Sequence, residues 1–404
     1  MASIGTISLE VEKGTFSPGA AFVLREASNI DANIQLEDGE VSVGMGCHYV
    51  VASLNNANGP EEAFQFGHQV AQRGLDMMAI TGKVSLSTTR SSEEYLLWWG
   101  EQGRIVFRSV STCTLKIRTS SPKISVRDVD GNEVKQPVIE PRYSPAFRYF
   151  RLAQITDDLF DAFRNAYLCF EMLLSSICPK GNSEREIEWL RRSLSLALEP
   201  SDFQIRLRLN TSDPVSELLT RVYSDTRLPL FHAKDGRNVL EPHDPGTRNE
   251  VADALELLLR TVLTISEKHF QARFPRGGMF KSAFNELIAP TLSNLRMLIS
   301  SDNSPLDPKE GNLDHTRFKE GIQMDAEFVS PTSPAELPIV RGVLDCRRFD
   351  SLTTIRRIDL FKPEKPLVAV TLDDDIGLQG IDEFQNYLRF SMQNMQQPRT
   401  SFSM

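Results

Sequence analysis

The stretch Thr156-Asp157-Asp158-Leu159-Phe160, with the apolar ladder that follows it, decides which fold the sequence favours. Its threonine can cap a helix, its two aspartates place negative charge in the first turn, and its phenylalanine with Ile155 stands at the positions of a hydrophobic staple. Apolar residues then recur at the spacing of one helix face, namely Leu159, Phe163, Ala166, Phe170, Leu173, Leu174 and Ile177. A long amphipathic helix is predicted here.

Four more helices are predicted after this one. Their starts are marked by Ser183-x-x-Glu186, by Asp213-Pro214, by Thr247-x-x-Glu250 and by the region of Lys281, from which the last helix runs to about Ile299. Proline after Asp213 suits the first helical position, and the two boxes each offer a side-chain cap. Five helices joined by short connections indicate a bundle.

Strand patterns lie on both sides of the helical region. Residues 1 to about 145 read mostly as strands, with one helix from Glu61 to about Met78. Strands return in Ile339–Leu344, Ile355–Leu360 and Leu367–Leu372, and a short helix is predicted from Ile381 to about Met392.

These patterns predict an α+β multidomain chain with a central all-α bundle flanked by strand-rich segments. The predicted parts are an N-terminal α+β, strand-rich domain (1–148), the helical bundle (149–300), a linker (301–314), a C-terminal strand-rich module (315–396) and a flexible tail (397–404). The C-terminal module can stand alone or pack back on the N-terminal sheet.

Composition excludes several classes of protein. The 404 residues are 40% hydrophobic and 25% charged, which is ordinary for a soluble globular protein and leaves no apolar run for a membrane span. A net charge of -9 argues against a protein that coats nucleic acid by bulk attraction. The start of the chain lacks a secretion signal, so a cytoplasmic location is expected, and the five scattered cysteines read as free buried thiols.

The candidate site lies in Asp225-Thr226-Arg227-Leu228-Pro229-Leu230-Phe231-His232, where an arginine and a histidine stand five positions apart. Arginine stabilises phosphoryl charge, and histidine transfers protons near neutral pH. Proline is tolerated in the first turn of a helix, so a helix is expected to begin near Pro229, with Arg227 just before it and His232 in its first turns. The alternative is an arginine that caps a neighbouring helix and a histidine satisfied by a backbone carbonyl.

This pair within predicted helices resembles the Arg-x4-6-His signature of HEPN-domain ribonucleases. The stretch Arg164-Asn165-Ala166-Tyr167 with Glu171 looks most like the ApeA-type branch, and Leu230 to Lys234 is similar to MauJ-like proteins. The resemblance implies a homodimeric, metal-independent endoribonuclease with Arg227 and His232 as catalytic residues and no cofactor. It also implies a setting of antiphage defence or toxin-like growth control.

Three cations near the pair, Lys234, Arg237 and Arg248, are predicted to hold RNA phosphates, although such charges usually only solubilise a surface. Active HEPN nucleases usually carry a polar residue after the arginine, where this chain has Leu228-Pro229. That departure motivates a second hypothesis, a lapsed interaction module that binds a protein or small ligand, with a partner or trigger acting through the N-terminal domain. Asp373-Asp374-Asp375 reads as an acidic turn, with a divalent cation site as the weaker alternative.

Overall fold

The computed structural model describes residues 2–9, 11–12, 15–89, 91, 93–114, 140–231, 240–241, 244–273, 286, 289–301, 321–329, 338–348, 354–362 and 365–391. The chain divides into two compact units. The strand-rich unit combines Met1–Leu115 with Met279–Met392, and the helical unit lies in Lys116–Gly278.

One mixed sheet of fourteen strands dominates the strand-rich unit, in the order β2-β1-β15-β14-β11-β12-β13-β16-β10-β9-β5-β8-β7-β6. Its N-terminal strands are β1 (Ala2–Ile4), β2 (Ile7–Ser8), β5 (Gly19–Val23), β6 (Ala32–Leu36), β7 (Gly39–Val43), β8 (Tyr49–Leu54), β9 (Tyr95–Glu101) and β10 (Arg104–Thr114). Its C-terminal strands are β11 (Leu295–Ser300), β12 (Ile322–Val329), β13 (Ile339–Asp345), β14 (Thr354–Lys362), β15 (Lys365–Leu378) and β16 (Glu383–Ser391). A separate hairpin pairs β3 (Val11–Glu12) with β4 (Thr15–Phe16), and short 3-10 turns occur at η2 (Ala289–Leu292) and η4 (Cys346–Arg348).

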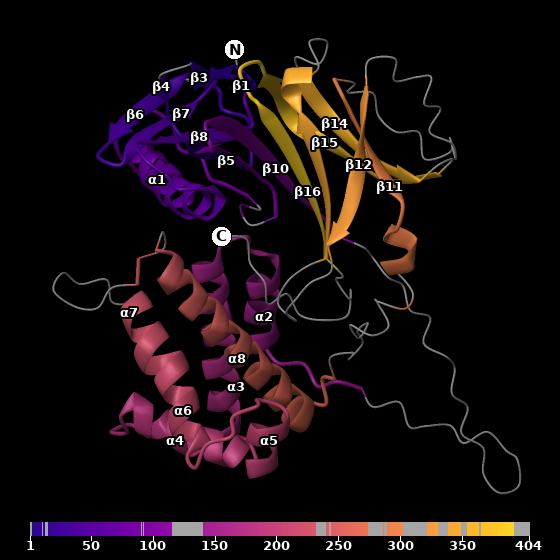
Figure 1. Ribbon diagram of the computed structural model, residues 1–404. Helices are drawn as coiled ribbons and strands as arrows, with labels where there is room; N and C mark the ends of the chain where they lie inside the picture. Colours follow the sequence, from indigo (N-terminus) through magenta and orange to yellow (C-terminus); the bar gives the residue numbers. More distant parts are fainter. Residues whose placement is uncertain are drawn as a thin grey trace, which may run out of the picture. The chain divides into compact units, whose positions relative to one another are not determined.

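The predicted fold class, a chain organised around a central all-α bundle, is wrong. The dominant element is the sheet, which draws strands from both sides of the helical segment. Two pairings join the halves: β10 lies parallel to β16, and β1 lies antiparallel to β15 (Figure 1). Hydrophobic periodicity identifies a strand but not the strand that pairs with it. No local sequence pattern therefore predicts the pairing across the helical segment. The expectation that the C-terminal strands pack back on the N-terminal sheet is confirmed.

Trp98 and Trp99 on β9 lie on opposite faces of the sheet, and both faces are buried there. Trp99 faces a core that also includes helix α1 (Pro60–Ile80), whereas Trp98 faces the larger core shared with the C-terminal strands. The helix packs very closely, since a Cβ added to Gly74 would lie 2.5 Å from the Val41 side chain. The predicted helix from Glu61 to about Met78 is confirmed, and both tryptophans are core residues.

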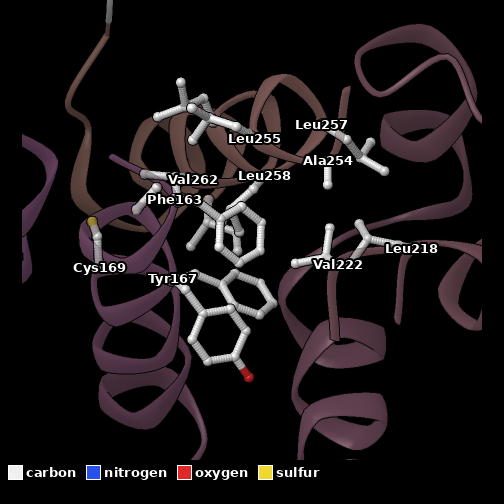
Figure 2. Packing of buried hydrophobic residues seen from close by; sticks show 14 of the residues in the cluster. Phe163, Tyr167, Cys169, Leu218, Val222, Ala254, Leu255, Leu257, Leu258 and Val262 are labelled. Atoms are coloured by element: carbon white, nitrogen blue, oxygen red, sulfur yellow. The ribbon is translucent and has the colours of Figure 1, made fainter. Parts of the chain in front are cut away.

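The helical unit is built around its own apolar core. Its elements are α2 (Ala146–Ile155), α3 (Leu159–Ile177), α4 (Glu186–Ala197), α5 (Pro200–Ile205), α6 (Pro214–Leu219), η1 (Thr220–Arg227), α7 (Leu228–Phe231) and α8 (Pro245–Phe270). Figure 2 shows side chains of α3, such as Phe163 and Tyr167, facing Val222 and the α8 residues Ala254 and Leu258. The predicted apolar ladder of α3 is buried almost throughout its length.

Several helix boundaries differ from the predicted ones. Helix α3 is capped by Asp158, whose carboxylate accepts a hydrogen bond from the Asp161 amide at 2.7 Å, while Thr156 ends α2. No new helix begins at Pro229, because α6, the π-helical segment η1 and α7 follow one another without a break.

Two predicted helices contain strands instead. The end of the helix expected from Lys281 to Ile299 is strand β11, and the helix expected from Ile381 to about Met392 is strand β16. In β16, the buried residues Phe384, Asn386, Leu388 and Phe390 recur with a period of two, which is the period of a strand. Among the described residues, no helix is both long enough and apolar enough to cross a membrane.

Candidate functional site

Arg227, the predicted anion-binding residue, is the last residue of the π-helical segment η1. Within this segment the Thr226 hydroxyl donates a hydrogen bond to the Arg221 carbonyl, five residues earlier, at 2.8 Å. A π-helical turn widens the backbone and re-aims the side chains that follow it, and such turns recur at functional sites. The π-helical turn therefore precedes and positions the Arg227 side chain.

Three aromatic rings surround the Arg227 guanidinium. Its carbon lies 5.5 Å from the ring centre of Tyr167, 5.4 Å from that of Tyr223 and 5.2 Å from that of Phe231. The arginine side chain is only 16% exposed. The negative faces of the rings take the place of water around the cation and hold the guanidinium in position. We call these four residues, with Glu171 and Glu186, the Arg227 cluster.

A pair of carboxyl groups completes the Arg227 cluster. Arg227 Nη2 lies 3.3 Å from Glu186 Oε1, and the Tyr223 hydroxyl donates a hydrogen bond to Glu186 Oε2 at 3.1 Å. Burial, together with the neighbouring Glu186 carboxylate, raises the pKa of Glu171 from 4.5 to about 7, and the Arg227 charge opposes this rise only in part. The Glu171 carboxyl therefore exchanges its proton near neutral pH, and while it is protonated the charge of Arg227 is paired with Glu186.

Two polar groups of the cluster have unused hydrogen-bonding capacity. In the described part of the chain, neither Arg227 Nε nor the Tyr167 hydroxyl has a hydrogen-bond partner, although both atoms are buried. Burial raises the pKa of Tyr167, so its hydroxyl stays neutral and can donate. Figure 2 places this hydroxyl at the edge of the apolar cluster. The cluster thus offers a cation and hydrogen-bond donors, the groups that receive an oxyanion.

The other predicted site residues are placed as follows. Arg248 is 7% exposed on α8, with its guanidinium carbon 5.9 Å from the ring centre of Phe160, so it offers little surface to an RNA backbone. His232, Lys234 and Arg237 lie outside the described residues. Of the five residues, the structure therefore places Arg227 and Arg248, and their ring contacts involve different aromatic residues.

Glu186 and Tyr223 were not predicted as site residues. Glu186 was assigned to a capping box with Ser183, but α4 begins with Arg185 as its cap and Glu188 as the partner of that cap. This leaves the Glu186 side chain to bind Arg227. Glu186 lies on a helix far from Arg227 in the sequence, so no local pattern links the two residues.

The acidic residues Asp373 to Asp375 do not form a turn, since they lie inside strand β15. Asp374 Oδ2 accepts hydrogen bonds from the His48 amide at 2.6 Å and from the Cys47 thiol at 3.2 Å. Burial raises the pKa of this thiol to about 12, so it is a hydrogen-bond donor and not a nucleophile. No group of side chains in the described ranges has the composition of a metal site. Asp374 therefore holds Cys47 and His48, the residues just before β8, against strand β15.

Comparisons of the chain with protein-family models, with curated proteins and with solved structures find no match.

Proposed function

We propose that the helical unit carries a metal-independent endoribonuclease site centred on Arg227. One observation carries the proposal: a guanidinium held against three rings lies beside a carboxyl group whose pKa is about 7. In the proposed reaction the 2'-hydroxyl oxygen of RNA bonds to the adjacent phosphorus, and the bond from phosphorus to the 5'-oxygen breaks. The proton of the nucleophile goes to a base, and an acid protonates the leaving oxygen.

Arg227 is assigned to stabilise the charge on the pentacoordinate phosphorus through its guanidinium, of which a part is exposed. His232 follows Phe231 in the sequence and is assigned the proton transfers, as the resemblance implies. Lys234 and Arg237 are assigned to RNA phosphates on the same basis.

Glu171 is assigned a positioning role. While it keeps its proton, the two glutamates carry one negative charge, which Arg227 balances, so a phosphate can approach. Above about pH 7 a second negative charge appears beside the phosphate site. Activity is therefore expected to fall as Glu171 ionises, and a Glu171→Gln variant is expected to keep its activity at higher pH.

The test is incubation of the full chain with single-stranded RNA in the presence of a chelator. Cleavage is expected to persist with the chelator and to fall by about a hundredfold or more in Arg227→Lys, which keeps the charge but loses the planar fork of donors. Arg221→Lys is the matched control, since Arg221 lies in the same π-helical segment with 41% of its side chain exposed. Cleavage that requires magnesium, or that survives both Arg227→Lys and His232→Ala, would refute this mechanism.

We also propose that the active form is a homodimer formed through the helical unit. One arginine and one histidine are a sparse set for a reaction that uses an acid and a base, and a twofold axis would double both. On α3, Leu168 and Met172 lie one turn apart and are each 37% exposed, although they are large and apolar. Sedimentation is expected to give twice the chain mass of 45.5 kDa, and a monomer in Leu168→Asp. A wild-type monomer that cleaves RNA at full rate would exclude the composite site.

A second candidate is an interaction module without catalysis. The ion pair between Arg227 and Glu186 favours it, because a guanidinium bound to a carboxylate and three rings also serves to hold helices together. In that case Arg227→Met lowers the stability of the helical unit, and the wild-type protein cuts no RNA under the conditions above.

A further inference from the structure

A second group of arginines lies on the sheet, and the site proposed above does not involve it. Arg108 on β10 has its guanidinium carbon 4.6 Å from the ring centre of Trp99 on β9 and 4.2 Å from that of Tyr387 on β16. Its Nε donates a hydrogen bond to Gln385 Oε1 at 2.8 Å. Two flanking strands thus fix this guanidinium by its faces and by one edge.

Arg108 is a partly buried cation. Burial lowers its pKa, the nearby Glu101 carboxylate opposes this only in part, and no carboxylate of the described residues lies within ion-pairing distance of the guanidinium. Taking a cation out of water is costly unless an anion or hydrogen-bond acceptors compensate. The rings and Gln385 compensate in part, and an anion that accepts hydrogen bonds from the other guanidinium nitrogens would compensate further.

Two more arginines lie on the same face of the sheet as Arg108. Arg389 on β16 lies 5.2 Å from the ring centre of Tyr95 and donates a hydrogen bond to its hydroxyl. Arg341 on β13 donates a hydrogen bond to the Tyr387 hydroxyl and also pairs with Glu327. The register sets Tyr387 opposite Arg341, so all these side chains rise from one face of β9, β10, β16 and β13. Three cations therefore gather on a chain whose net charge is -9.

A cavity begins at Arg341 and extends over β12 and β11. Its volume is about 650 Å³, and its polar lining includes Arg296, Gln323, Asp325, Glu327 and Arg341. A volume of several hundred Å³ suits a nucleotide-sized ligand. Carboxylate and amide oxygens in the lining are acceptors for hydroxyl and amino groups of such a ligand.

We propose that this face of the sheet binds a nucleotide, with its phosphate on the arginines Arg108, Arg341 and Arg389 and its remainder in the cavity that Arg341 lines. Guanidinium groups bind phosphate with two parallel hydrogen bonds, and several cations suit the multiple charge of a phosphate better than that of a single carboxylate. The nucleotide is either free or one unit of an RNA strand, and both present the same chemistry.

The test measures binding to the full chain by calorimetry with ATP, and by fluorescence anisotropy with a labelled 2'-O-methyl oligoribonucleotide. The methylated strand lacks the nucleophile of the proposed cleavage, so binding is read independently of any ribonuclease activity. ATP binding identifies a free nucleotide, whereas binding of the oligonucleotide alone identifies a strand. Either result supports the proposal if Arg108→Gln weakens it by about tenfold or more, the loss expected for charge-assisted hydrogen bonds.

The matched control is Arg73→Gln, which removes the same charge from α1, where Arg73 pairs with Asp38 and is 44% exposed. This control is expected to change the affinity less than twofold. If Arg108→Gln does not fold, Arg341→Gln, whose side chain is 41% exposed, decides the question. The proposal is overturned if neither probe binds at about 1 mM, or if a folded Arg108→Gln or Arg341→Gln variant binds as tightly as the wild type.

Discussion

Replacing Glu171 by glutamine is expected to stabilise the protein at pH 8 and to change its stability little at pH 5. Glutamine resembles the protonated glutamate in shape and can still donate a hydrogen bond to Glu186, but it never ionises. The folded wild type must place a second negative charge beside Glu186 at pH 8, and the variant avoids this.

The size of the effect follows from the pKa of Glu171, which is raised from 4.5 to about 7 by burial and by Glu186. Below pH 4.5 both the folded and unfolded states hold the proton, so there is no cost. Between these values only the unfolded chain releases it, so stability falls as the pH rises, and the full cost is present above pH 7. At about 1.4 kcal/mol per pKa unit this cost is about 3.5 kcal/mol, which solvent screening reduces to about 1–2 kcal/mol.

The assay is urea unfolding followed by far-ultraviolet circular dichroism at pH 5 and pH 8. Glu171→Gln is compared with Glu250→Gln, which neutralises an exposed glutamate on α8. Only the Glu171 variant is expected to gain about 1–2 kcal/mol at pH 8 relative to its effect at pH 5. An equal effect at both pH values, or a loss of stability at pH 8, would refute the raised pKa of Glu171.

Three further predictions concern the strand-rich unit. Gly74→Ala is expected to cost about 1–3 kcal/mol in thermal unfolding, because the added methyl group meets Val41, although alanine normally favours a helix. Asp359→Ala is expected to cost about 3–5 kcal/mol in urea unfolding, because it leaves the charge of Arg357, which is 2% exposed, without the carboxylate 2.9 Å from its Nε. Cys47, whose pKa is raised to about 12, is expected to resist iodoacetamide at pH 8 until the protein is unfolded, as mass spectrometry of the alkylated chain would show.

Helices α1, α3, α4, α6 and α8 were predicted because the signals that form them are local, whereas α2 and α5 were not predicted. The ladder from Leu159 to Ile177 repeats with the period of a helix and forms α3 with nearly the predicted bounds. The cap was misplaced because Thr156, Asp157 and Asp158 are all suitable cap residues, and the choice of Asp158 depends on where the preceding helix α2 ends.

The sheet was less predictable because its order depends on distant partners. Strand β16 was taken for a helix, since its apolar residues also fit a helical period over one or two turns. Its identity as a strand follows from its neighbours β10 and β13, which lie in different parts of the sequence.

The candidate site was predictable in part. Arg227 was found because arginine and histidine stand close together in sequence, and Tyr167 and Glu171 entered through the family resemblance. Glu186 and Tyr223 come from other turns and helices, and only the packing of α4 against α6 and its continuation brings them to Arg227.

Because of the topology, the two proposed sites are expected to form at different stages of folding. Every residue of the Arg227 cluster lies in the helical unit, whose contacts form within Lys116–Gly278. The Arg108 site instead needs β10 and β16, which pair from Val106 with Glu383 to Thr114 with Ser391, so it requires strands from both ends of the chain. Pairing at such sequence separation is slow, because the entropy of closing the long intervening loop is lost before the strand contacts can compensate for it. The Arg227 cluster is therefore expected to assemble before the sheet closes, and the Arg108 site only after it.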